Sequence, residues 1–321
     1  MRHKGIISPM VGLWVMVVLL LGGGAACARP TQVPAGSTAP TPLGRIANGM
    51  VEVPAGPFVR GSTDEDIAYF VQLCDQNDAG CIADNFLDEQ PVREITLATF
   101  WIDQFEVANR EFQEFVELTD YRTLAERRGS SAVWNDALEV RQSIDTLGAT
   151  WRAPSGAGSD IRMQLDHPVV HVGWEDAQAY CIFRGKRLPT EAEWEKAARG
   201  PAGWRFPWGN TWEPGRVKGV LPDEVADTAV ATTSYPQGAS PYGAHHMLGN
   251  VFEWVDDWYD PYYYATSPAT DPVQRDAASQ LRVIRGGGWA TRAGYLHTGW
   301  RRIVAPDPTG NTLGFRCARD P

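Results

Sequence analysis

The stretch HPVVHVGWEDAQAYCIFRGKRLPTEAEWEKAARG, residues 167–200, contains the clearest secondary-structure signals of the 321-residue chain. Apolar residues recur at helical spacing over residues 174–183 and again over residues 190–199, which predicts two helices. The second helix has a sharp start, because Thr190 and Glu193 follow Pro189 in the order of a capping box. The stretch therefore predicts two short, well-delimited helices.

Outside this stretch, regular periodicity is confined to short segments. Helical spacing occurs over residues 64–74 and 109–118, and MVEVPAGPFVRGS, residues 50–62, predicts two short strands around a Pro/Gly turn. Turn-forming residues are frequent, with 32 Gly and 23 Pro in the chain, and residues 121–166 predict an insertion with a surface loop. Together these features predict an α+β fold with little regular secondary structure.

The composition is that of a globular protein with an acidic balance. Hydrophobic residues make up 43% of the chain and charged residues 21%, and the length allows one large domain with a packed core. Asp and Glu total 39 against 29 Lys and Arg, so the chain offers no basic stripe for a phosphate backbone. Nucleic acid is therefore excluded as an expected partner.

The first 27 residues have the layout of an export signal. Basic residues precede a mostly apolar run over residues 10–21, which is followed by GGGAAC ending at Cys27. The run is shorter than the roughly 20 residues that span a membrane. A cysteine after small residues is typical of a bacterial lipoprotein signal, although Gly24 stands where such signals prefer leucine. We expect residues 1–27 to be a signal peptide with lipid attached at Cys27; cleavage without lipidation and an uncleaved anchor are the alternatives.

The signal is followed by a segment that cannot bury a core. Residues 28–48 are rich in Pro, Thr, Ser and Ala and contain almost no large apolar side chain, which predicts a flexible tether. From residue 49 the composition becomes that of a folded domain, which we expect to extend over residues 49–321. This organisation predicts a membrane-anchored lipoprotein of the bacterial cell envelope, facing the periplasm or the exterior.

The five cysteines fit this compartment. They are Cys27, Cys74, Cys81, Cys181 and Cys317. Setting Cys27 aside for lipid leaves an even four, as disulfides in an oxidising compartment require. Cys74 and Cys81 lie close in sequence and are expected to pair, which leaves Cys181 to join Cys317. The alternative is four buried free thiols.

Five motifs follow one another in the second half of the chain. They are the opening stretch, FPWGN (206–210), MLGNVFEW (247–254), VIRGGGW (283–289) and TLGFRCARD (312–320). Preceded by MVEVPAGPFVRGS and by FWIDQFEVANREFQEF (100–115), they resemble the formylglycine-generating enzyme family, also called the sulfatase-modifying factor family, over about residues 49–321. The resemblance implies a compact, loop-rich α+β fold related to C-type lectins. It also implies a disulfide between the positions of Cys181 and Cys317.

The segment after RGGGW differs from that of the active family members at the positions of the copper ligands. Active members of the family oxidise a cysteine of a sulfatase polypeptide to formylglycine, using oxygen and a copper ion held by two cysteine thiolates. Alignment without gaps from RGGGW puts Thr291 and Leu296 at these two positions. No cysteine lies between Cys181 and Cys317, so no shift of the alignment restores the ligands. Copper is therefore not an expected cofactor, and no catalytic residue is assigned.

Other positions of the family's substrate groove are recognisable. Gly288 stands where the family has the serine of its oxygen pocket, Thr312 stands where it has an asparagine, and Tyr295 is kept. Aromatic residues beside glycines suit a groove that holds a peptide or a glycan. The expected degenerate site or groove comprises Gly288, Trp289, Thr291, Tyr295, Leu296, Trp300 and Thr312. Of the nearby arginines 285, 301, 302 and 316, most are expected to bridge loops to carboxylates and a minority to face a ligand.

Calcium is a possible cofactor by the same resemblance. The family builds one calcium site around LGNVFEW, which here would use the carboxylate of Glu253 and backbone groups near Gly249 and Val251. His246 stands where an Asn or Asp ligand is expected, and imidazole suits calcium poorly. An iron or zinc site of His245, His246, His297 and Glu253 is the alternative, but the adjacent histidines are expected to point in different directions.

These observations leave three hypotheses for function. The first is a non-catalytic binding or scaffolding module at the bacterial envelope, whose groove recognises a protein, peptide or glycan. The second is a divergent metal-dependent oxidase related to formylglycine-generating enzymes. The third is a structural envelope lipoprotein.

Overall fold

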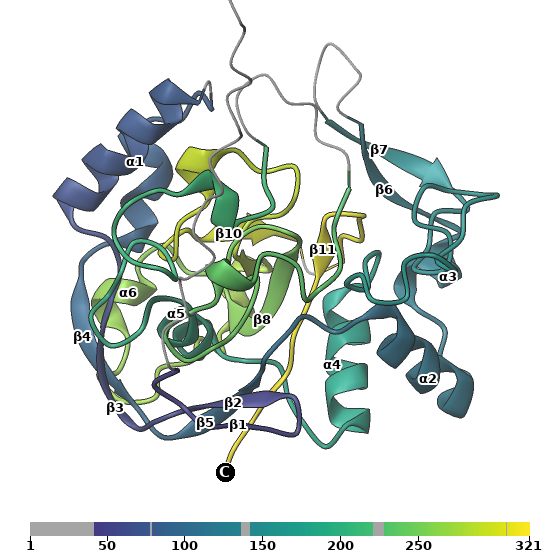
Figure 1. The fold of residues 1–321 in the computed structure, drawn as a ribbon, viewed down its shortest axis with the longest axis horizontal. Coiled ribbons are helices and arrows are strands. Elements are labelled where there is room, and N and C mark those ends of the chain that lie inside the picture. Colours follow the sequence, from purple (N-terminus) through teal and green to yellow (C-terminus); the bar gives the residue numbers. More distant parts are fainter. Residues whose placement is uncertain (1–41, 78, 136–141, 221–227, 306) are drawn as a thin grey trace, which may run out of the picture. The chain divides into compact units, whose positions relative to one another are not determined.

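Short helices and strands joined by many turns make up the computed structural model, which describes residues 42–77, 79–135, 142–220, 228–305 and 307–321 (Figure 1). The described residues belong to one compact unit, Ala39–Pro321. The expected α+β class is confirmed. The expected signal peptide, Cys27 and most of the expected tether lie outside the described residues.

One four-stranded sheet brings together the start, the middle and the end of the domain. Its order is β1 (Ile46–Ala47), β2 (Met50–Val53), β5 (Phe100–Asp103) and β12 (Ala318–Arg319), all paired antiparallel. β1 lies within the expected tether of residues 28–48. Paired backbone therefore begins before residue 49, where the domain was expected to start.

A second four-stranded sheet carries the motifs of the expected site. Its order is β10 (Arg302–Val304), β9 (Arg282–Arg285), β8 (Phe252–Trp258) and β11 (Leu313–Gly314). β8 contains the FEW residues of MLGNVFEW, β9 leads into the glycines of RGGGW, and β11 runs parallel to β8. β10 pairs with β9 alone and forms an edge of the sheet among the described residues.

Two small hairpins complete the strands. The first is β3 (Gly56–Arg60) with β4 (Arg93–Leu97), and the second is β6 (Ser130–Asn135) with β7 (Gln142–Leu147). The two strands expected over residues 50–62 are present as β2 and β3, but they join different sheets. The expectation of a surface loop over residues 121–166 was incomplete, because that interval contains α3 (Leu124–Arg128) and β6–β7. β7 is largely exposed and polar, so no apolar alternation marked it.

The four expected helices are confirmed within two residues at each end. They are α1 (Asp64–Gln76), α2 (Asn109–Thr119), α4 (Trp174–Phe183) and α5 (Glu191–Arg199). The capping box of α5 is formed: the Glu193 N–H donates to Thr190 Oγ1 at 3.1 Å, and the Thr190 N–H donates to Glu193 Oε2 at 2.8 Å. Shorter turns of helix are α6 (Tyr263–Thr266), η1 (Ala83–Glu89), η2 (Pro214–Arg216), η3 (Pro236–Gly238), η4 (Ala277–Ser279) and η5 (Ala293–Tyr295).

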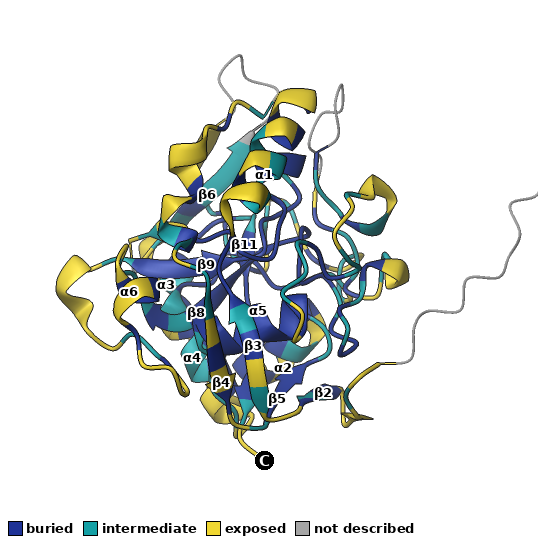
Figure 2. Cartoon of the chain, turned by 90° about the vertical axis from the view of Figure 1, so that its left-hand side faces the viewer, coloured by how far each residue is buried: buried dark blue, intermediate teal, exposed yellow. Residues whose placement is uncertain are grey.

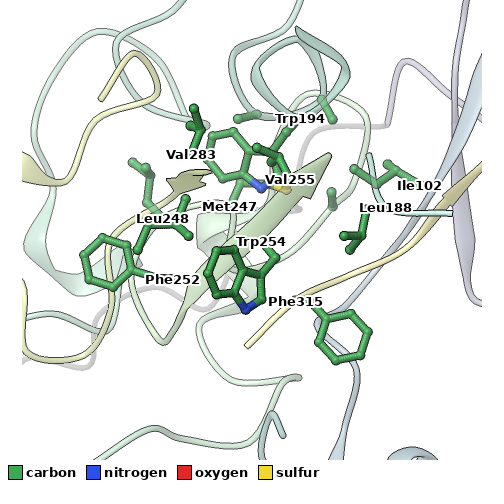
Figure 3. Close-up of a cluster of buried hydrophobic side chains, with 14 of the residues drawn as sticks. Ile102, Leu188, Trp194, Met247, Leu248, Phe252, Trp254, Val255, Val283 and Phe315 are labelled. Atoms are coloured by element: carbon green, nitrogen blue, oxygen red, sulfur yellow. The ribbon is translucent and has the colours of Figure 1, made fainter. Parts of the chain in front are cut away.

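The core surrounds α5 and β8. Trp194 of α5 and Trp254 of β8 are fully buried, and Figure 3 shows both among apolar side chains such as Met247 and Val283. α5 is buried along its whole length, its charged residues included, as the dark colouring around it in Figure 2 indicates. The acids and Arg199 form ion pairs, and Lys196 donates to the carbonyls of Pro54 and Gly56, so each buried charge has a partner, as buried ions require.

Both expected disulfides are present. Cys74 pairs with Cys81 and Cys181 pairs with Cys317, with Cα–Cα distances of 5.8 and 5.7 Å. The alternative of four free thiols is therefore wrong. Within the part of the chain that the structure describes, no helix is both long enough and apolar enough to cross a bilayer.

Candidate functional site

The RGGGW segment leaves β9 through a turn that only glycine accommodates well. Gly286 and Gly287 have φ values of 89° and 73°, which disfavour other residues. A Cβ on Gly287 would lie 2.6 Å from Leu296 Cδ2 and 3.2 Å from Thr291 Cγ2. The bare glycine therefore allows both side chains to approach the backbone closely.

Thr291 and Leu296, the two positions that the resemblance assigns to copper ligands, thus meet at one point. Thr291 Oγ1 accepts a hydrogen bond from the Gly288 N–H at 2.9 Å. Leu296 is 1% exposed and packs against both Gly287 and Gly219, where an added Cβ would lie 2.4 Å from Leu296 Cδ1. A hydroxyl engaged with the backbone and an isobutyl group without any donor atom do not fit a Cu(I) site, which needs soft thiolate ligands.

A cavity of about 570 Å³ opens above this point. Four of the seven expected positions line it: Thr291, Tyr295, Trp300 and Thr312. The other three, Gly288, Trp289 and Leu296, are buried and do not line it. We call this cavity the groove; its remaining lining residues are Ala79, Asn85, Trp134, Ser143, Val220, Phe252, Ala290, Arg292, Arg301, Arg302 and Ile303.

The three expected positions that do not line the groove are structural. Trp289 is 2% exposed, donates through Nε1 to the Asn311 carbonyl at 3.0 Å and packs against Val170 and Val251. Gly288 is buried, and a Cβ there would lie 3.2 Å from the Thr312 carbonyl oxygen. The expectation that Trp289 lines the groove was wrong, because its ring turns into a small apolar cluster rather than outward.

The groove walls come from segments far apart in the sequence. The connection after α1, the β6–β7 hairpin and β10 all contribute, and Figure 1 shows α1 and the hairpin on either side of β10. The Tyr295 hydroxyl donates to Asn85 Oδ1 at 3.2 Å, and burial raises the pKa of Tyr295, so the phenol stays a neutral donor. No local sequence signal joined these walls to the RGGGW segment.

Aromatic rings form a continuous surface inside the groove. The Tyr295 and Trp300 ring centroids are 4.8 Å apart, and those of Phe252 and Trp300 are 5.7 Å apart. These rings can pack against an apolar or aromatic part of a ligand. The groove therefore has an aromatic surface above a point that has no copper ligands.

Two arginines of the groove have no carboxylate partner among the described residues. Arg292 donates only to the Asn77 carbonyl, at 3.2 Å, and Arg302 lies over the Phe252 ring at 5.1 Å from its centroid. Arg301 differs, because its guanidinium is fully buried and donates to both oxygens of Glu191 at 2.8 and 3.1 Å. None of the described lining residues is an Asp or Glu. The described lining of the groove is therefore positively charged.

The expectation that most of the four arginines bridge to carboxylates is confirmed. Arg285 contacts Glu191 and Glu195, and Arg316 contacts Glu253. Arg302 is the exception among them: it lines the groove and has no ion pair with any described residue.

The geometry does not fit calcium at Glu253. Arg316 donates to both Glu253 oxygens at 2.7 Å, and Trp194 Nε1 donates to Glu253 Oε2 at 2.8 Å. A guanidinium held this closely neutralises the carboxylate and repels a second cation.

The histidines of the alternative metal site have different neighbours. His245 packs against Phe105, His246 against Tyr235, and His297 against Phe70. Across the described ranges, no group of three or more His, Cys, Asp or Glu side chains is arranged to hold a metal ion. An iron or zinc site of these residues therefore finds no support in the geometry.

Comparison with known proteins gives the same family for the whole domain. Residues 36–321 match the family model described as "Sulfatase-modifying factor enzyme 1-like domain". The formylglycine-generating enzyme of Streptomyces coelicolor is 38% identical, over 92% of this chain and 96% of that protein. The "Inactive C-alpha-formylglycine-generating enzyme 2" of Bos taurus is 37% identical, over 84% of this chain and 87% of that protein.

Solved structures share the fold. The structure of PvdO from Pseudomonas aeruginosa superposes with a TM-score of 0.64 at 24% identity, covering 85% of this chain and 94% of that one. Variable protein 1 of Treponema denticola superposes with a TM-score of 0.57 at 18% identity, covering 88% of this chain and all of that one. On the family match and the identity to its relatives, the chain belongs to the formylglycine-generating enzyme, or sulfatase-modifying factor, family.

Proposed function

We propose that the groove binds a polypeptide without oxidising it, and that the protein is a non-catalytic binding module of its family. The observation that carries this proposal is the meeting of Thr291 and Leu296 at Gly287, directly below an open aromatic surface. The binding surface is present, whereas the atoms that would hold copper are replaced by a hydroxyl and an alkyl group.

Peptide is the better of the two expected ligand classes. Eight of the fifteen described lining residues are apolar or aromatic, and none of the fifteen is a carboxylate of the kind that commonly binds sugar hydroxyls. β10 contributes to its lining and pairs with β9 alone among the described residues, so its other edge offers backbone groups for pairing with an extended chain. A glycan would find hydrogen-bond donors here, among them Asn85, Ser143 and Arg292, but no carboxylate among the described lining residues.

We further propose that the module is exported and held at the bacterial envelope through lipid on Cys27. The layout of residues 1–27 supports this, as do the two disulfides, which are typical of proteins in oxidising compartments.

Copper loading with a restored ligand pair tests the absence of oxidase chemistry. The purified chain and a Thr291→Cys/Leu296→Cys variant are treated with Cu(I), and each is assayed for oxygen consumption and aldehyde formation on a cysteine-containing peptide. We expect the variant to bind about one equivalent of Cu(I), because both side chains lie against Gly287. We expect the natural chain to bind none and to form no aldehyde.

Stoichiometric copper or iron with turnover in the natural chain would instead establish the divergent oxidase. A Thr312→Trp variant, which fills the groove, is the control for peptide binding. If this variant retains peptides as well as the natural chain does, the groove is not the binding site.

A further inference from the structure

A second cavity adjoins the groove along β10. It has a volume of about 680 Å³, and Asn85, Arg301 and Ile303 line both cavities. Its wall includes Leu87 and Tyr262, which are 54% and 74% exposed, so apolar surface is left open to solvent. A strand edge flanked by two cavities is suited to an extended chain whose side chains point alternately to different sides.

β10 has the properties of an accepting edge. It pairs only with β9 within the described residues, through Arg302, Ile303 and Val304. Ile303 is 44% exposed at the rim where the two cavities meet. An exposed strand edge with an apolar side chain is a place where another chain adds to a sheet.

The charge of the groove selects the chemistry of that chain. Among the described residues, Arg292 and Arg302 have no carboxylate partner and no acid lines the groove, whereas Asp84 and Asp88 line the second cavity. The whole chain is acidic, with 39 Asp and Glu against 29 Lys and Arg, so a positive groove is a local departure from the overall charge. A ligand carboxylate would supply the missing partner in charge-assisted hydrogen bonds.

We propose that an acidic segment of another polypeptide adds to the free edge of β10. It places a carboxylate in the groove at Arg292 and Arg302, and a neighbouring apolar side chain in the second cavity against Leu87 and Tyr262. This inference rests on the proposed function and names the chemical class of its ligand.

The test begins with a random peptide library displayed on phage and selected on the full chain. We expect selected peptides to combine Asp or Glu with a nearby apolar residue. Fluorescently labelled copies of them then give dissociation constants for the natural chain and for Arg292→Gln and Arg302→Gln. We expect each substitution to weaken binding about tenfold or more, as the loss of a hydrogen bond between charged groups does.

Two further arms test the geometry. Two methylated forms of the selected peptide are made, one on the odd-numbered backbone nitrogens and one on the even-numbered ones. Only the form methylated on the nitrogens that face β10 should lose binding, because only those N–H groups pair with the strand. Leu87→Ser should reduce the preference for an apolar residue. Arg162→Gln is the matched control, because Arg162 is exposed, pairs with Asp160 and lies outside both cavities, and it should leave affinity unchanged.

The outcomes separate the two proposals. Peptides selected without acidic residues, bound equally by the arginine variants, would overturn this inference and leave the peptide groove intact. If the natural chain selects no more peptides than the Thr312→Trp variant does, the proposed function itself is overturned. A heparin-derived hexasaccharide that binds more tightly than every selected peptide, and depends on the same arginines, would show that the occupant is an anionic glycan and would overturn the peptide assignment. Thermal melting of each variant checks that the substituted protein is folded.

Discussion

At the scale of single residues, Glu89 has the most unusual environment. Its carboxyl group is fully buried, accepts a hydrogen bond from Ser62 Oγ at 2.5 Å and lies 3.3 Å from His297 Nε2. Burial raises the pKa of Glu89 to about 8 and lowers the pKa of His297 well below its usual range. A neutral carboxylic acid therefore faces a neutral imidazole at pH 7. Nothing in the sequence marked Glu89, because its partners lie 27 and 208 residues away.

Glu89→Gln should change how stability depends on pH. The unfolded carboxyl loses its proton near pH 4.3, whereas the folded one keeps it up to about pH 8. Because the folded state binds more protons than the unfolded state between these two pH values, the free energy of unfolding of the natural chain falls as pH rises. The glutamine cannot ionise and keeps both contacts, so its stability relative to the natural chain should rise by on the order of 3 kcal/mol between pH 5 and pH 8. Urea unfolding at several pH values measures this difference.

The control for this measurement is Glu94→Gln, a substitution of an exposed carboxylate on β4. Its difference from the natural chain should stay nearly constant over the same window. A constant difference for Glu89→Gln as well would mean that Glu89 is ionised and forms an ion pair with a protonated His297.

At the scale of elements, the Cys74–Cys81 disulfide supports one wall of the groove. It joins the end of α1 to the start of η1, and Cys74 packs so closely against Gly294 of η5 that a Cβ there would lie 1.8 Å from Cys74 Sγ. Asn77, within the disulfide loop, accepts the hydrogen bond of Arg292, and Asn85 follows on η1. The position of the Arg292 side chain therefore depends on this loop.

Removing this disulfide should impair binding more than folding. For a loop this short, a Cys74→Ala/Cys81→Ala variant should lose about 2 kcal/mol of unfolding free energy. Its affinity for a groove-binding peptide should fall, because Arg292 loses its fixed neighbour. Calorimetry and peptide titration measure the two effects.

Cys181→Ala/Cys317→Ala is the matched control. Its disulfide spans 136 residues, so its removal should cost about 5 kcal/mol. Because it joins α4 to the C-terminal segment away from the groove lining, the folded variant should retain peptide affinity. Equal losses of affinity in both variants would show that the loop of residues 74–81 has no specific role in the groove.

At the scale of the whole molecule, paired buried charges connect α5 to the rest of the domain. Glu191 accepts hydrogen bonds from Arg285 and Arg301, and Glu195 contacts Arg199 and Arg285. Glu195 also accepts from the Gly61 N–H next to β3, at 2.8 Å. Truncating one member of such a buried network leaves an unpaired buried charge, which destabilises the folded state. The fully buried acids of α5 therefore depend on these arginines.

The proposed anchoring also concerns the whole molecule. Growth of the native host with a palmitate analogue should label the full chain, and Cys27→Ser should abolish the label, because the lipid is attached to that thiol. Cys74→Ala/Cys81→Ala should remain labelled. A label that survives Cys27→Ser would overturn the lipoprotein proposal.

The sequence by itself determined the family, the four helices, the cysteine pairing and the loss of the copper thiolates. These depend on local patterns: a capping box starts a helix wherever it stands, and a leucine at position 296 lacks a ligand atom in any fold. Only the tertiary structure decided which arginines are paired. Arg301 pairs with Glu191, which lies 110 residues away in the sequence, whereas the adjacent Arg302 faces the groove. Counter-ions are chosen by contacts in space, so adjacent and chemically identical residues acquire different roles.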